Sequence, residues 1–164
     1  MNKHIPILFC LGIVLLGACK KDKKGDDTIN FNGITATDMN ANIIVKDNSD
    51  WRTDDSTWSD REYALLGGRL PRSKNRFDYK IIAYPNPCFQ YFNLFRLSDG
   101  YLKNWEYCIV DKHYNVLMKG VNDSYNFTIN TDSLKVTDTV RVYYRIVYQD
   151  SARYGHGDIM IAKP

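Results

Sequence analysis

The sequence predicts a mainly β protein, an antiparallel β-sandwich preceded by an extension that contains one short helix. From residue 80 onward, short runs rich in β-branched and aromatic residues are broken by turn residues every 8 to 12 positions or so. The twelve Tyr and seven Phe also favour strands. One helix-initiation pattern precedes this region. The 164 residues suffice for one ordinary domain with additions at its ends.

Residues 1–18 have the layout of a secretory signal peptide. Lys3 supplies the positive charge, residues 5–16 are almost wholly apolar, and small residues stand directly before Cys19. The apolar run is shorter than the roughly 20 residues that a membrane-spanning helix needs. The pattern therefore predicts export followed by cleavage.

The four residues Leu16-Gly17-Ala18-Cys19 resemble the lipobox of bacterial lipoproteins. This resemblance implies cleavage between Ala18 and Cys19, a diacylglycerol thioether on the Cys19 thiol, and acylation of the new amine. Two or three acyl chains anchor a protein stably, because each buried methylene contributes about 0.8 kcal/mol. The predicted partner is therefore a membrane, held through the lipid on Cys19.

Residues 19–30 are predicted to form a charged, flexible tether. Its stretch from Lys20 to Asp27 has no apolar residue to bury. Charged residues directly after a lipidated cysteine resemble the signals that send some lipoproteins of the Bacteroidetes to the cell surface. The resemblance implies a location in the cell envelope, at the outer membrane. Whether the domain faces the periplasm or is exposed on the surface stays open.

Residues 31–79 are predicted to form a hairpin and the short helix. Two extended pieces flank an Asn-rich turn within residues 35–45. Ser59-Asp60-Arg61-Glu62 has the form of a capping box, with Trp58 and Tyr63 at the spacing of a hydrophobic staple. A helix should follow through Leu66 and end at Gly67-Gly68.

Residues 80–164 are predicted to form the sandwich. Strands are expected at 81–84, 89–97, 105–110, 116–118, 139–148 and 158–162. The two prolines of Tyr84-Pro85-Asn86-Pro87 exclude a central strand and predict an extended corner. Trp105, Tyr107 and Ile109 alternate with three other residues, so one face of their strand is expected to be distinctly apolar.

Two motifs in this half resemble the C-terminal sorting domain of the type IX secretion system. They are Tyr84-Pro85-Asn86-Pro87 and Tyr107-Cys108-Ile109-Val110-Asp111, the latter followed by Val116-Leu117. That family is a small immunoglobulin-like β-sandwich, so the resemblance implies an immunoglobulin-like fold for residues 80–164. Tyr114 stands where the family usually has Gly, and the ending from Arg153 to Asp158 is not the family's usual one. The fold is therefore a firmer expectation than the sorting role.

Cleavage and lipidation leave Cys88 and Cys108 in the folded part. Outside the cytoplasm, two thiols can persist as a disulfide. They can equally be two small buried hydrophobic side chains. Both alternatives stay open, and neither cysteine has a histidine at the spacing of a metal site.

Five Asp-Ser or Asp-Thr pairs, each with the residue that follows it, resemble the Asp-Ser/Thr-apolar acceptor sequence of general O-glycosylation in Bacteroidetes. Such pairs are also common in turns. We expect at least one to carry a glycan, which would be bulky and lie on the surface. The candidate acceptors are Thr28, Ser56, Ser133, Thr139 and Ser151.

Three residue groups are weighed as sites of chemistry. His156 and Asp158 lie among glycines without a nucleophile motif or a third metal ligand, so a turn with a locally hydrogen-bonded Asp is favoured. An acidic stretch lacks the spacing of an EF-hand loop, so a solvated loop is expected rather than a Ca²⁺ site. The tryptophans are expected in the core rather than in a sugar-stacking platform. The residues of the acidic stretch are Asp47, Asp50, Asp54 and Asp55. The tryptophans are Trp51, Trp58 and Trp105.

These observations predict a lipid-anchored cell-envelope protein that acts as a non-catalytic binding or structural module. The net charge is only +3 and four of the lysines lie beside the anchor, so the folded part is nearly neutral and lacks the basic patch of a nucleic-acid-binding protein. The alternative is a carbohydrate-binding accessory lipoprotein. No metal or cofactor is predicted, and the partner beyond the membrane is expected to be an envelope protein or a glycan.

Overall fold

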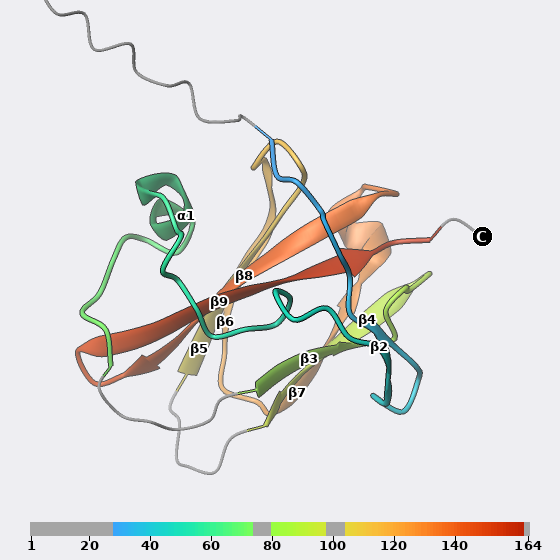
Figure 1. Ribbon diagram of the computed structural model, residues 1–164, viewed down its shortest axis with the longest axis horizontal. Coiled ribbons are helices and arrows are strands. Elements are labelled where there is room, and N and C mark those ends of the chain that lie inside the picture. The colour runs from blue at the N-terminus through green and yellow to red at the C-terminus, as the bar shows by residue number, and fades with distance from the viewer. Residues whose placement is uncertain (1–27, 74–79, 98–103, 163–164) are drawn as a thin grey trace, which may run out of the picture.

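The computed structural model describes residues 28–73, 80–97 and 104–162 (Figure 1). The predicted signal peptide, Ala18, Cys19 and the tether up to residue 27 lie outside these residues. No helix in the described ranges is both long and apolar enough to span a bilayer.

Two antiparallel sheets form the sandwich. One has the order β3-β4-β7, with β3 at Lys80–Tyr84, β4 at Tyr91–Leu97 and β7 at Asn126–Asn130. The other has the order β6-β5-β8-β9, with β5 at Asn104–Val110, β6 at Val116–Asn122, β8 at Thr139–Tyr148 and β9 at Ser151–Met160. The prediction of a mainly β antiparallel sandwich with one short helix is confirmed.

The strand order is that of an immunoglobulin-like sandwich with one strand moved. In the constant-type domain the first, second, fourth and fifth strands share a sheet and the third, sixth and seventh form the other. Here the fourth strand of the sandwich, β6, pairs with β5 instead of joining β3, β4 and β7. The remaining six strands keep the constant-type partition.

The main core lies between the two sheets. On β5 and β8, every second side chain points into it, as expected for strands. Trp105, Tyr144 and Phe92 are among its largest fully buried members. At about 25 cal/mol per Å² of buried apolar surface, these aromatic rings contribute strongly to stability.

The outer face of the four-stranded sheet is also buried. Cys108, Val110, Tyr143 and Tyr154 belong to a second apolar cluster, which the extension covers with Trp58 and the helix. The apolar face predicted for residues 105–110 is confirmed, because Trp105 and Ile109 lie in the main core, and the opposite face of this strand is buried as well. Figure 1 shows the extension, coloured blue to green, crossing in front of β9.

The helix α1 spans Asp60–Leu65 and begins where the sequence predicts. The Glu62 carboxylate accepts from the Ser59 backbone N–H at 2.7 Å, and Trp58 packs on Tyr63 with ring centroids 5.4 Å apart. Both the capping box and the hydrophobic staple thus hold its start. It ends before Gly67, whose φ is +80°.

The predicted hairpin is present as β1 (Ala36–Thr37) and β2 (Ile43–Val45). It is tied to the Pro-Asn-Pro corner through Asn86, which is fully buried. The Asn86 amide donates to the Thr35 and Asp158 carbonyls, and its side-chain oxygen accepts from the Met160 N–H. This corner therefore joins the hairpin to the end of β9.

Other expectations need correction. The last strand begins at Ser151 rather than Asp158, while β7 and a 3₁₀ turn at Thr131–Leu134 were not predicted. Ile29, placed in the tether, is 6% exposed and donates its N–H to the Lys112 carbonyl at 2.7 Å. Ile29 is apolar, so burying it against the second cluster is favourable.

Candidate functional site

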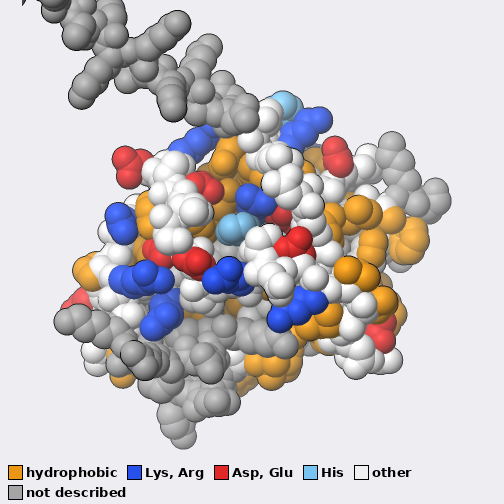
Figure 2. Space-filling model, in the orientation of Figure 1, with side chains coloured by type: hydrophobic (Ala, Val, Ile, Leu, Met, Phe, Trp, Pro, Cys, Tyr) orange, Lys and Arg blue, Asp and Glu red, His pale blue; other side chains and the backbone are white. Residues whose placement is uncertain are grey.

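A polar hollow of about 360 Å³ opens on the face that the extension crosses. We call it the Arg141 pocket. Its walls come from β8, β9, the start of α1 and the segments 30–33 and 49–57. Figure 2 shows acidic, basic and histidine side chains close together in the middle of this face. Its charged or titratable lining residues are Asp50, Arg52, Asp54, Glu62, Arg141, His156 and Asp158.

The base of the pocket is a paired guanidinium and carboxylate. Arg141 Nε and Nη2 donate to the two oxygens of Asp158 at 2.7 and 2.8 Å. These residues face each other across β8 and β9, and the Asp158 side chain is only 5% exposed. The bidentate geometry fixes both side chains and neutralises both charges. Burial nevertheless raises the pKa of Asp158, because it outweighs the contribution of the guanidinium.

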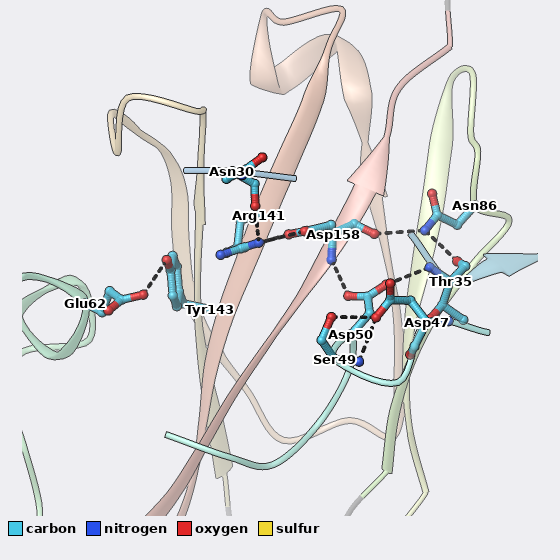
Figure 3. A network of polar contacts seen from close by, with 10 residues as sticks. All are labelled: Asn30, Thr35, Asp47, Ser49, Asp50, Glu62, Asn86, Arg141, Tyr143 and Asp158. Atoms are coloured by element: carbon cyan, nitrogen blue, oxygen red, sulfur yellow. Dashed lines mark hydrogen bonds and ion pairs between the residues drawn. The ribbon is translucent and has the colours of Figure 1, made fainter. Parts of the chain in front are cut away.

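A second carboxylate links the extension to β9. Asp50 accepts from the Thr35 N–H at 2.8 Å and from the Asp158 N–H at 2.7 Å (Figure 3). Burial raises the pKa of Asp50 to about 6, against the effect of these two hydrogen bonds. The nearby charge of Asp158 acts in the same direction as burial.

His156 lies two residues from Asp158 on the same face of β9. The prediction of a turn here was wrong, because both residues belong to a long strand. Burial, and then the charge of Arg141, lowers the pKa of His156 to about 4, so its imidazole is neutral at pH 7. Its Nδ1 is buried and has no hydrogen-bond partner.

The far wall of the pocket is held by a tyrosine and a glutamate. Tyr143 faces His156 across the sheet and donates its hydroxyl to Glu62 at 2.9 Å. Trp58 packs edge-on against Tyr143 with ring centroids 5.1 Å apart. The first turn of α1 is therefore fixed to the sheet by both a hydrogen bond and aromatic packing.

The acidic stretch does not form the solvated loop that was expected. Asp50 and Asp55 are each 8% exposed, and Asp55 accepts from the Tyr63 hydroxyl at 2.9 Å. Asp47 and Asp54 are partly exposed and accept from the backbone N–H groups of Ser49 and Ser56. Within the described residues, no three His, Cys, Asp or Glu side chains are grouped as a metal site.

The three tryptophans are buried. Trp51 and Trp58 are each 9% exposed and Trp105 is fully buried, as expected of core residues. They cannot form a sugar-stacking platform. A larger hollow of about 440 Å³, between Ile43, Trp51 and Ile81, is mainly apolar and shares only Asp50 and Arg52 with the Arg141 pocket.

Cys88 and Cys108 are free thiols, and both are fully buried. Cys88 lies in the core between the sheets, whereas Cys108 lies in the cluster on the outer face of β5. The structure therefore has the second of the two alternatives, two small buried hydrophobic side chains. Burial raises the pKa of Cys88 to about 11, which keeps the thiol protonated.

The five candidate glycosylation acceptors are all exposed or partly exposed. The Ser133 hydroxyl donates to the Asn130 carbonyl and the Ser151 hydroxyl to the Tyr148 carbonyl. Ser56 lies at the edge of the Arg141 pocket. Modification at any of the five stays a prediction.

Sequence reasoning did not identify Arg141 or Glu62 as parts of a site. Arg141 reaches Asp158 only because the β8–β9 register places them opposite each other. A signal was present, since Arg141 and Arg145 alternate with apolar residues on the predicted strand and so share a face. The sequence could not show which residues lie opposite or against this face of β8.

Comparisons with family models, with curated proteins and with solved structures find no match to this chain.

Proposed function

We propose that this chain is a lipid-anchored protein of the cell envelope whose sandwich acts as a non-catalytic binding or structural module. The observation that carries the proposal is the sequence Leu16-Gly17-Ala18-Cys19 directly after an apolar run of signal-peptide length. The lipid on Cys19 holds the protein at a bilayer and so limits its partners to those within reach of the membrane.

The Arg141 pocket supports a binding role. It is open to solvent, its charged walls are fixed by hydrogen bonds from three elements, and it rests on the rigid four-stranded sheet. A site that is held in place before a ligand arrives loses less conformational entropy on binding. These features fit recognition of a small polar ligand or of a polar group on a larger partner.

The arrangement also supports a role without catalysis. The Asp158 carboxylate accepts from Arg141 and is not the group that orients the imidazole of His156. His156 Nδ1 binds no nucleophile. A general base needs a substrate or nucleophile proton within hydrogen-bond reach and a group that orients it.

The test of the anchor is metabolic labelling. Cells that express the chain are fed a labelled fatty acid, and the protein is compared with its Cys19→Ser and Cys10→Ser variants. We expect label on the wild type and on Cys10→Ser, because Cys10 lies in the predicted signal peptide, and none on Cys19→Ser. An unlabelled wild-type protein, or a Cys19→Ser variant that is still cleaved and sediments with membranes, would contradict the proposal.

The second candidate function is a carbohydrate-binding accessory lipoprotein. The observation that favours it is the mixture of hydrogen-bond donors and acceptors around the Arg141 pocket.

We further propose an outer-membrane location and at least one O-linked glycan. Protease shaving of intact cells tests surface exposure, and the mass of the purified protein tests the glycan.

A further inference from the structure

The charges in the Arg141 pocket are largely paired within the protein. Arg141 is held by Asp158, and Arg52 lies 3.5 Å from Asp54. Asp50 receives two backbone N–H groups, and Glu62 receives the Tyr143 hydroxyl and the Ser59 N–H. An ionic ligand would have to compete with these existing partners, whereas a neutral ligand would not.

Beyond these internal pairs, the residues that line the Arg141 pocket can still donate and accept hydrogen bonds. Each carboxylate oxygen has more than one lone pair, so the oxygens that line the pocket can still accept. Asn30, Asn32 and Thr57 add amide and hydroxyl groups at the edge. A ligand that carries several hydroxyls can donate to some of these groups and accept from others.

An independent observation comes from His156. Its Nδ1 is buried without a partner, and the ring lines the same pocket. A buried polar atom without a hydrogen bond costs about 1–3 kcal/mol, so a ligand hydroxyl that reached it after a rotation of the ring toward the pocket would recover that free energy. The neutral imidazole offers one donor and one acceptor nitrogen, which suits a hydroxyl better than it suits a charged group.

We propose that the Arg141 pocket binds a neutral polyhydroxyl ligand of the sugar class through hydrogen bonds, with His156 as a direct contact. The inference rests on the proposed binding function and names its ligand. The volume of about 360 Å³ lies at the lower end of ligand sites, which span about 300–1,000 Å³, so the ligand is small. Because the three tryptophans are buried, no indole is available for stacking, and the affinity is expected to be modest.

The test uses the mature lipoprotein in a zwitterionic detergent without a sugar headgroup. Saturation-transfer NMR at pH 7 follows glucose, galactose, mannose and N-acetylglucosamine, with glucuronate and glucosamine as charged analogues. We expect saturable binding of at least one neutral sugar and weaker binding of both charged analogues. Absence of saturable binding by every neutral sugar, or tighter binding of a charged analogue, would overturn the proposal.

The variants test the site itself. His156→Phe keeps a ring against Trp58 and Tyr143 but removes both nitrogens, and we expect it to weaken binding by about tenfold, the effect of one good hydrogen bond. His113→Phe, in the exposed turn after β5, is the matched control and should bind as the wild type does. If His156→Phe does not fold, Asn32→Ala at the exposed edge replaces it.

Unchanged affinity in a folded His156→Phe variant, or in Asn32→Ala if that variant takes its place, would show that the sugar binds elsewhere. Fatty-acid labelling of Cys19 does not depend on this result. Failure of the sugar proposal is therefore distinguishable from failure of the anchor.

Discussion

Two titratable residues in the Arg141 pocket have opposite effects on stability in acid. The pKa of Asp50 is raised from 3.8 to about 6, so its contribution to stability is fully present below pH 3.8 and is lost as the pH rises through 6. The pKa of His156 is lowered from 6.5 to about 4, so its contribution is present above pH 6.5 and is lost as the pH falls through 4. Each effect amounts to about 3 kcal/mol, at about 1.4 kcal/mol for each pKa unit.

We therefore predict that single substitutions separate these two effects. As the pH falls from 6.5 to 4, the stability of Asp50→Asn should decrease relative to the wild type, and the stability of His156→Gln should increase relative to the wild type. Urea unfolding of the three proteins at several pH values in this range measures the difference. Parallel pH profiles for all three would show that neither side chain titrates as described.

Gly157 is required by the indole that lies against it. A Cβ at this position would lie 2.2 Å from the ring of Trp51, which also stacks with Tyr144 in the core. We predict that Gly157→Ala destabilises the protein by about 1–3 kcal/mol, the usual cost of overpacking. A double-mutant cycle with Trp51→Ala, measured by urea unfolding, should give a combined cost smaller than the sum of the single costs. Strict additivity would contradict this account.

At the scale of the elements, α1 depends on the sheet beneath it. The helix has only six residues, too few to be stable alone in water. Trp58, directly before its cap, contacts Tyr63, Tyr143 and Tyr154, and so joins the helix to β8 and β9. The stability of the helix therefore comes from this aromatic cluster.

We predict that Trp58→Ala lowers the free energy of unfolding by about 3–5 kcal/mol. It should also increase amide hydrogen exchange in α1 before the strands exchange. Phe89→Ala is the control, since Phe89 is 59% exposed and its removal should change stability by no more than about 0.5 kcal/mol. Equal costs for the two variants would contradict the role given to Trp58.

At the scale of the whole molecule, the sequence predicted what local patterns determine. The helix start follows from Ser59 and Glu62, and β3, β4, β5, β6 and β8 follow from their β-rich runs. The glycines at 155 and 157 suggested a turn, but they serve long-range contacts with Tyr144, Arg52 and Trp51. Neither these close contacts of the glycines nor the pairing of Arg141 with Asp158 can be predicted without the register of β8 and β9.

The sandwich and the extension form a single packed unit. Trp51 donates its N–H to the His156 carbonyl at 2.9 Å, and Ser73 donates to the Ala152 carbonyl at 3.1 Å, so the extension covers the edge of β9 at two points. Without it, Tyr143 and Tyr154 on the outer face would be exposed to water, and the core would lose the Trp51 ring. An uncovered strand edge also favours aggregation.

We therefore predict that a chain of residues 80–164 does not fold, although these residues contain every strand of the sandwich. It should lack a cooperative thermal transition and should bind a dye specific for exposed apolar surface. A chain of residues 28–164 is the control and should unfold cooperatively, because it keeps Trp51, Trp58 and Ile29 in place. Cooperative unfolding of both chains at the same temperature would mean that the extension adds little to the fold, and its contacts with β9 would then need another explanation.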